Sequence, residues 1–198
     1  MKLDLVHDIQ TSYRKVLNSM SRPGRIENIA LQSKKADIEI DFYPTTLVIM
    51  LMLLDAEVSY KIVSAREEEI TNLINQLTYA KFKSTEDADF IFVLQDATTK
   101  QIEEAFRNAK IGNLIDPHQS TTLIVETNGL SNDHEMILKG PGIAEIEYAK
   151  IQVDANWIHE REMKNQEYPL GIDVIFIDRD SNMMCIPRTT QILKQVVK

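Results

Sequence analysis

Arg188, Thr189 and Thr190 are the residues of this chain whose types and order best fit anion-binding chemistry. A guanidinium presents a fork of N–H donors that matches the oxygens of a phosphate or a carboxylate, and adjacent hydroxyls can complete the cradle. Pro187 fixes the backbone immediately before the arginine. A structural interpretation stands beside this one, in which Arg188 pairs with an acid such as Asp173 and Thr189 caps the segment that follows.

A second segment, Lys139-Gly140-Pro141-Gly142-Ile143, brings glycine and proline to the end of an apolar run. Glycines at such a place allow another backbone or a ligand to approach closely. The segment is not a Walker loop, since no Gly-Lys-Ser/Thr follows, and it lacks the third glycine of a dinucleotide fingerprint. A tight turn packed against a neighbouring subunit is the alternative.

Asp173 ends a third segment, Pro169-Leu170-Gly171-Ile172-Asp173, and opens an apolar run. A carboxylate that is buried there must be paired or protonated. It could orient Arg188, coordinate a cation carried by a triphosphate, or act as a base.

A fourth segment, Ser21-Arg22-Pro23-Gly24, follows an amphipathic stretch whose Ile9, Tyr13, Val16, Leu17 and Met20 form one apolar stripe. Proline and glycine are expected to end that helix. Arg22 either contacts a ligand or partner, or lies beside the last carbonyl groups of the helix, where cations are favoured.

The spacing of apolar residues predicts the elements that must position these segments. Helices are expected at 9–20, 44–54, 65–77, 98–109 and 154–165, with capping boxes at Ser64/Glu67 and Thr98/Gln101 and a cap at Asp154. Strands are expected at 38–42, 58–62, 90–94, 121–126, 135–138, 172–177 and 183–186. The last two of these strands are expected to pair antiparallel across a turn at 178–182. The tail from residue 191 could be a helix or an edge strand. Strands alternate with helices early and pair late, which predicts an α/β fold with a mixed sheet flanked by helices.

Composition limits the function. The 198 residues carry a net charge of −8, which argues against nucleic-acid binding through a basic face. The longest apolar run, Leu47 to Leu54, is too short for a membrane span, and no secretory signal is seen, so a soluble, cytoplasmic protein of one domain (1–198) is expected. The single cysteine, Cys185, lies in an apolar run and is expected to be buried and inert, and the four histidines show no spacing for a metal site.

In order and spacing, the four segments resemble those of the PhnH subunit of the bacterial carbon–phosphorus lyase system. The motifs that carry the resemblance are Arg22-Pro23-Gly24, Gly140-Pro141-Gly142-Ile143, Gly171-Ile172-Asp173 and Pro187-Arg188-Thr189-Thr190. The resemblance implies a fold similar to the large domain of pyridoxal-phosphate-dependent transferases without a working pyridoxal site, and hence no cofactor. It also implies a homodimer in isolation and an assembly with the PhnG, PhnI and PhnJ subunits. That assembly, with PhnI as its catalytic centre, is thought to exchange the adenine of ATP for an alkylphosphonate.

Two hypotheses follow, because the residues themselves offer no catalytic set. In the first, Arg188, Thr189, Thr190 and the Gly140-Pro141-Gly142 loop anchor a phosphorylated small molecule, ATP or a phosphonate. In the second, the motifs build only the homodimer and the docking face for the other subunits. An independent pyridoxal-phosphate enzyme is disfavoured, since neither a Schiff-base lysine nor an acid for the ring nitrogen stands in a recognisable context.

Overall fold

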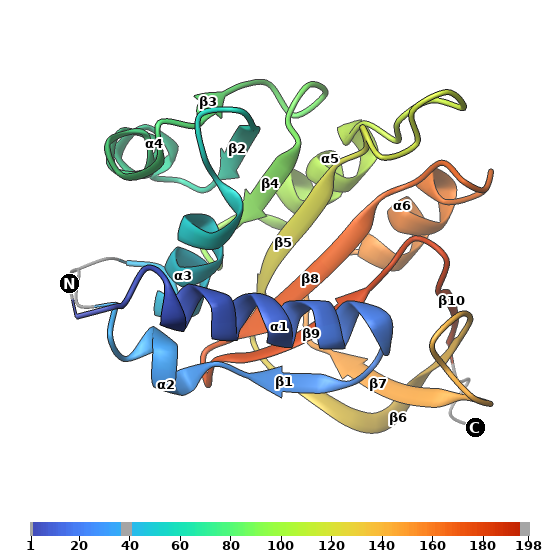
Figure 1. Ribbon diagram of the computed structural model, residues 1–198. Helices are drawn as coiled ribbons and strands as arrows, with labels where there is room; N and C mark the ends of the chain where they lie inside the picture. The colour runs from blue at the N-terminus through green and yellow to red at the C-terminus, as the bar shows by residue number, and fades with distance from the viewer. Residues whose placement is uncertain (1, 37–40, 195–198) are drawn as a thin grey trace.

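The computed structural model describes residues 2–36 and 41–194, and side chains up to 193. It contains a seven-stranded mixed sheet with helices on both faces, and a three-stranded antiparallel sheet beside it (Figure 1). The expected α/β class with a mixed sheet flanked by helices is confirmed.

The helices are α1 (His7–Ser21), α2 (Ala30–Ser33), α3 (Pro44–Leu53), α4 (Glu67–Thr78), α5 (Thr99–Asn108) and α6 (Trp157–Lys164). The strands of the large sheet, in spatial order, are β1 (Ile26–Asn28), β9 (Asn182–Ile186), β8 (Asp173–Asp178), β5 (Thr122–Thr127), β4 (Phe90–Val93), β2 (Ser59–Val63) and β3 (Lys81–Phe82). The small sheet has the order β10 (Gln191–Lys194), β6 (Leu130–Lys139) and β7 (Glu147–Ile151).

Five strands of the large sheet, β3, β2, β4, β5 and β8, run parallel, and β9 returns antiparallel to β8 as expected. The parallel strands therefore share two edges. We call the edge where β5 starts at Thr122 and β8 starts at Asp173 the amino edge. The opposite edge, where these strands end at Thr127 and Asp178, is the carboxyl edge.

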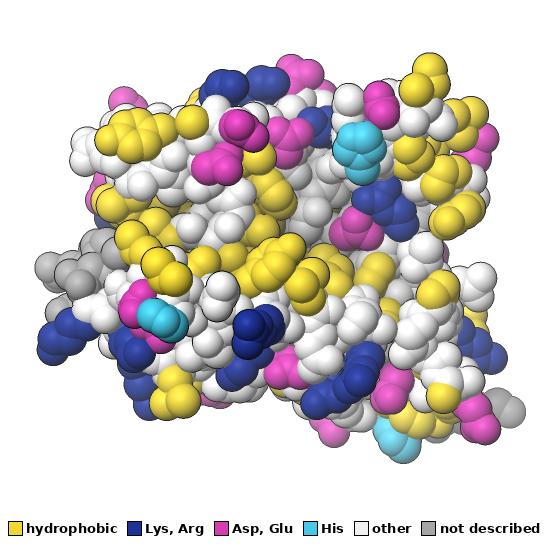
Figure 2. Space-filling view, viewed as in Figure 1, with side chains coloured by type: hydrophobic (Ala, Val, Ile, Leu, Met, Phe, Trp, Pro, Cys, Tyr) yellow, Lys and Arg dark blue, Asp and Glu magenta, His cyan; other side chains and the backbone are white. Residues whose placement is uncertain are grey.

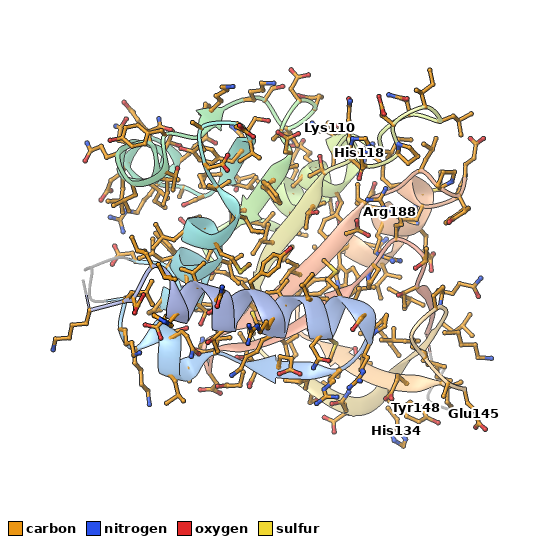
Figure 3. All side chains as sticks on the ribbon, in the orientation of Figure 1. Lys110, His118, His134, Glu145, Tyr148 and Arg188 are labelled. Carbon is orange, nitrogen blue, oxygen red and sulfur yellow. The ribbon has the colours of Figure 1, made fainter. Side chains whose placement is uncertain are left out.

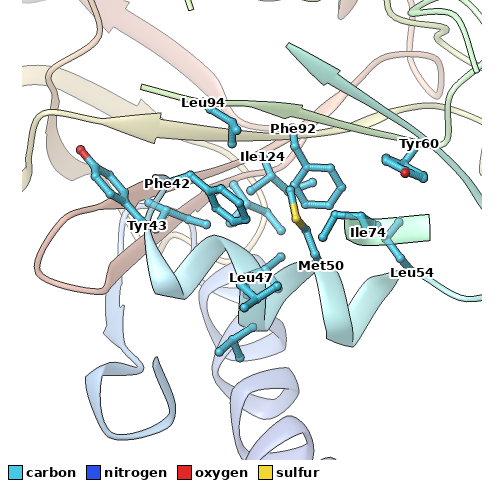
Figure 4. Packing of buried hydrophobic residues seen from close by; sticks show 14 of the residues in the cluster. Phe42, Tyr43, Leu47, Met50, Leu54, Tyr60, Ile74, Phe92, Leu94 and Ile124 are labelled. Atoms are coloured by element: carbon cyan, nitrogen blue, oxygen red, sulfur yellow. The ribbon is translucent and has the colours of Figure 1, made fainter. Parts of the chain in front are cut away.

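Hydrophobic residues alternate between two cores, one on each face of the large sheet. Ile62, Phe92 and Ile124 point to the core under α1, α3 and α4, which Figure 4 shows around Met50 and Phe92. Their neighbours Val63, Val93 and Val125 point to the second core, under α5, α6 and the small sheet. Both faces are covered, which is why these strands read as continuous apolar runs.

Helix α1 buries an unexpected face. Its buried residues are Asp8, Ser12, Val16 and Ser19, whereas Tyr13 and Leu17 of the apolar stripe are 47% and 49% exposed. Specific polar contacts hold this orientation. The Asp8 carboxylate accepts hydrogen bonds from Lys35 Nζ at 2.8 and 3.0 Å, and Ser19 Oγ accepts one from the Cys185 N–H at 3.0 Å. Sequence spacing located the stripe but could not show that two of its five residues, Tyr13 and Leu17, face outward.

Local capping signals were partly right. The Thr98/Gln101 box is present at α5. The box at Ser64 was wrong, because α4 begins later, at Glu67, and the Ser64 hydroxyl instead accepts from the Arg66 N–H and donates to Asp96. The cap at Asp154 was also wrong, because Asn156 precedes the first turn of α6 and its side chain makes no capping bond.

The remaining predicted strands differ in their positions and partners. The strand expected at 38–42 falls mostly outside the described residues, and its last residue, Phe42, is buried just before α3. The strands expected at 121–126 and 135–138 belong to different sheets, and the tail from Gln191 pairs with β6 as a strand. Within the described ranges, no helix combines the length and apolar character needed to cross a bilayer.

Candidate functional site

The four glycine- and proline-rich segments meet at the amino edge. A Cβ atom added to Gly140 would lie 2.8 Å from the Thr189 carbonyl oxygen, and one added to Gly142 would overlap the Ser21 carbonyl oxygen. Gly171 packs in the same way against the Asn165 side chain and the Arg188 Cβ atom. The glycines therefore serve close packing between the segments, which is one of the roles left open by the sequence.

Asp173 holds Arg188 at the centre of this cluster. Its Oδ1 atom accepts the Arg188 backbone N–H at 2.7 Å, and its Oδ2 atom accepts Nη2 at 2.5 Å and Nε at 3.2 Å. Nη1 donates to the Pro117 carbonyl oxygen at 2.9 Å, and Nη2 also donates to Ser120 Oγ at 2.5 Å. All three guanidinium nitrogens are thus engaged by the protein, as the pairing interpretation requires, and an anion would have to share these donors.

The cluster lies at the opposite edge from the usual ligand site of an open α/β sheet. Such sheets bind ligands beyond the carboxyl ends of their parallel strands. Asp173 is the first residue of β8, and Gly24 precedes the matching end of β1. The segments do mark strand ends, but they mark the amino edge.

Thr189 and Thr190 form a turn rather than a cap. The Thr190 N–H donates to the Pro187 carbonyl oxygen at 2.9 Å, and β10 follows directly, so Thr189 caps no helix. Thr190 is 2% exposed, and its hydroxyl oxygen has no hydrogen-bond partner in the described part of the chain. Both threonines line a cavity of about 670 Å³ between α6, Pro141 and β10.

Arg161 also lines this cavity, and sequence reasoning missed it. It lies on α6 four residues after the buried Trp157, on the same helix face, and is 2% exposed. Its Nη2 donates to the carbonyl oxygens of Pro187 and Thr190 at 2.6 and 3.1 Å, and its Nε has no partner among the described residues. Desolvation lowers the pKa of Arg161 to about 10, so the group is charged at neutral pH. The signal available in the sequence was an arginine on the inward face of an amphipathic helix.

Arg22, Pro23 and Gly24 line a separate hollow of about 470 Å³, together with Asn132 and Gly142. Pro23 and Gly24 are buried, and Asn132 Nδ2 donates to the Gly24 carbonyl oxygen at 2.9 Å. Arg22 is exposed at the rim of this hollow. The structure thus places Arg22 outside the Arg188 cluster, while Gly24 and Pro23 anchor the segment next to Gly142.

Lys110 forms a partly buried ion pair with Asp89 near the amino edge. Lys110 Nζ donates to Asp89 Oδ1 at 2.5 Å, and Figure 3 shows Lys110 and His118 on the same side of the molecule as Arg188. On the small sheet, His134 stacks on Tyr148 with ring centroids 3.8 Å apart. No three His, Cys, Asp or Glu side chains gather into a set able to hold a metal ion in residues 2–36 and 41–193.

The carboxyl edge contains a buried acid, Glu126, that the sequence analysis also missed. Its carboxylate accepts three hydrogen bonds, from the Tyr43 N–H at 2.8 Å, Thr46 Oγ1 at 2.6 Å and the Gln95 N–H at 3.0 Å. Burial raises the pKa of Glu126 despite these bonds. Through these hydrogen bonds Glu126 connects β5 to the start of α3 and to the segment that follows β4, which is a structural role.

The fold and the site together define the class of this protein. It is an α/β domain in which glycine- and proline-rich loops surround an Arg–Asp ion pair at the amino edge of a mixed sheet. Sequence comparison then gives the family. The family model described as bacterial phosphonate metabolism protein (PhnH) matches residues 3–193. The chain belongs to the PhnH family.

A curated relative agrees with this assignment. The chain is 24% identical over 186 residues to "Putative C-P lyase subunit protein HtxG" of Stutzerimonas stutzeri, an alignment that covers 92% of this chain and 85% of the relative. The similarity thus extends over most of the length of both proteins.

Proposed function

We propose that this chain is a non-autonomous subunit of the carbon–phosphorus lyase core assembly in organic phosphonate catabolism. In this proposal it supports the transfer of an alkylphosphonate onto the ribose of ATP with release of adenine. Membership of the PhnH family and similarity to a protein named as a C–P lyase subunit support the assignment. Within the assembly its partners are PhnG, PhnI and PhnJ, in the cytoplasm, and in isolation it forms a homodimer.

The observation that carries a subunit role is the outward apolar face of α1. Tyr13 and Leu17, one turn apart, are about half exposed, and Val6 extends the face at 63% exposure. Figure 2 shows hydrophobic side chains gathered in a band along α1 and in the hollow above it. A contiguous exposed apolar surface of this kind is typical of protein–protein contacts.

The helix cannot turn this face inward without breaking polar contacts. The Asp8–Lys35 pair and the Ser19–Cys185 hydrogen bond fix the opposite face against the protein. The exposed stripe is therefore a stable feature of the folded chain, available to a partner subunit.

The second candidate is a purely structural dimerisation and docking subunit with no ligand site of its own. The engagement of Arg188 by Asp173, Ser120 and the Pro117 carbonyl favours it, because the donors that were expected to hold a phosphate are already used. An activity assay on the reconstituted assembly, containing variants that still assemble, separates the two candidates.

The proposal includes a fold that resembles the large domain of the pyridoxal-phosphate transferases, without the cofactor. An absorbance scan of the purified protein after incubation with pyridoxal phosphate tests the absence of a working cofactor site. We expect no band from a protein-bound aldimine, and a band that survives gel filtration would contradict the proposal.

The docking role is tested with the double variant Tyr13→Ser/Leu17→Ser and the control Leu114→Ser/Ile115→Ser. The control also removes two exposed apolar side chains, of 67% and 90% exposure, from a loop away from α1. We expect both variants to fold, and only the α1 variant to lose co-purification with PhnG, PhnI and PhnJ. Assembly by the α1 variant at the level of the control would contradict the docking role.

A further inference from the structure

Two residues that line the cavity beside α6 each have a buried polar side-chain atom that the described part of the protein leaves unpaired. It measures about 670 Å³ and is bounded by α6, Pro141 and the turn that leads into β10. Four buried side-chain polar atoms of the described residues have no hydrogen-bond partner, and two of them, Arg161 Nε and Thr190 Oγ1, belong to residues that line this cavity. Buried polar atoms are normally paired, so two unpaired ones at one cavity indicate a missing partner.

Arg161 is the stronger of the two signals, because it is a buried charge. Its hydrogen bonds all go through Nη2, to two backbone carbonyl oxygens, and it forms no salt bridge with a described carboxylate. Buried cations in proteins are usually paired with an anion. Arg188, which lines the same cavity, differs in this respect because it forms a direct ion pair with Asp173, whereas Asp173 and Glu162 act on Arg161 only as nearby charges.

We propose that this cavity is a binding site for one small oxyanionic group, held by the Arg161 guanidinium and the Thr190 hydroxyl. Both groups are hydrogen-bond donors, and together they match the oxygens of a phosphate or a carboxylate. Tyr168 and Leu170 also line the cavity and add apolar surface to it, which fits an organic group attached to the anion. The exposed Glu162 at the rim disfavours a ligand with several negative charges.

This inference stands apart from the proposed role in the phosphonate assembly, since it concerns the isolated chain. It also assigns the contact with the anionic ligand to Arg161 and not to Arg188. A failure to bind an anion would leave the docking role untouched, and a failure to assemble would leave the anion site untouched.

The experiment is isothermal titration calorimetry of the full chain with inorganic phosphate and, separately, with acetate, in chloride buffer. We expect at least one of the two to bind at millimolar concentration or below. Thr190→Val removes the unpaired hydroxyl and no hydrogen bond within the protein, so we expect it to fold and to weaken binding about fivefold or more. Arg161→Met should abolish binding.

Thr71→Val is the matched control. The Thr71 hydroxyl is also buried and unpaired among the described residues, but Thr71 lies on α4 and does not line the cavity. We expect this variant to bind as the natural chain does. Binding of phosphate alone or of acetate alone, weakened in Thr190→Val, would support the site and identify the oxyanion it accepts.

Three results would overturn the proposal. One is the absence of binding of either anion to the natural chain. The second is equal binding by Thr190→Val and Thr71→Val. The third is binding that survives in a folded Arg161→Met variant, as judged by its near-UV circular dichroism. If Arg161→Met does not fold, the comparison of the two Thr→Val variants decides the question.

Discussion

Asp173 binds both the backbone N–H and the guanidinium of Arg188, 15 residues further along the chain. One carboxylate thus joins the start of β8 to the turn after β9, and the loop before Ser120 closes over the same guanidinium. The side chains are only 17% and 20% exposed, so the pair is screened less than a surface salt bridge.

Removal of Arg188 is expected to weaken the fold. Arg188→Ala leaves Asp173 without its counter-ion in a largely buried place, and we expect a loss of about 1–3 kcal/mol in the free energy of unfolding, after allowance for the remaining exposure. Urea denaturation followed by circular dichroism measures it. Lys100→Ala, which removes an exposed partner of Glu104, is the control and should change stability by less than about 0.5 kcal/mol. Equal effects of the two substitutions would show that the Asp173–Arg188 pair contributes little.

Gly142 is expected to tolerate no side chain. It has a φ of +85°, and a Cβ atom would overlap the Ser21 carbonyl oxygen, so Gly142→Ala should cost about 2 kcal/mol or more in the free energy of unfolding. Gly129→Ala is the matched control, because its Cβ would meet only the flexible end of the Gln152 side chain. Thermal unfolding of both variants tests the difference. Similar midpoints would mean that residues 21–24 and 140–142 are not packed as described.

The contribution of Glu126 to the free energy of unfolding should decrease as pH rises. Its pKa in the folded protein is raised by burial, so the folded state holds this proton up to a higher pH than the unfolded state does. The contribution of Glu126 to stability therefore falls as pH rises from the ordinary glutamate pKa to the raised one, by about 1.4 kcal/mol for each pH unit between them.

The measurement is the difference in unfolding free energy between the natural chain and Glu126→Gln, taken across this pH range. Glutamine cannot titrate, so the difference isolates the contribution of this carboxyl group. We expect the natural chain to lose stability relative to the variant as pH rises. A difference that is constant with pH would show that the pKa of Glu126 is not raised.

Cys185 should be unreactive until the protein unfolds. Its side chain is fully buried, and burial raises the pKa of the thiol to about 12, so almost no thiolate is present at neutral pH. We expect a thiol reagent to label the natural chain only in denaturant. Leu17→Cys, which places a thiol at a site that is 49% exposed, should add one group that is labelled rapidly under native conditions. Rapid native labelling of Cys185 itself would contradict its burial in the core.

The sequence determined the features of this protein that depend on neighbouring residues. The α5 capping box uses residues three apart, the apolar run of α3 specifies a helix buried on several sides, and the β8–β9 turn joins adjacent strands. These elements were predictable because their propensities and hydrogen bonds are local. The order and spacing of the glycine- and proline-rich segments were enough to indicate the family.

Tertiary structure decided which of these residues face one another, which are buried, and which lie at the surface. The apolar stripe of α1 was visible in the sequence, but the bonds of Asp8 and Ser19 orient the helix so that Tyr13 and Leu17 face outward. The sequence left open whether Arg188 pairs with Asp173 or holds an anion, and the fold shows the pairing, while the partially paired Arg161 lines the cavity beside it. Charge compensation and burial depend on contacts between distant parts of the chain, and the spacing of residues along it does not contain them.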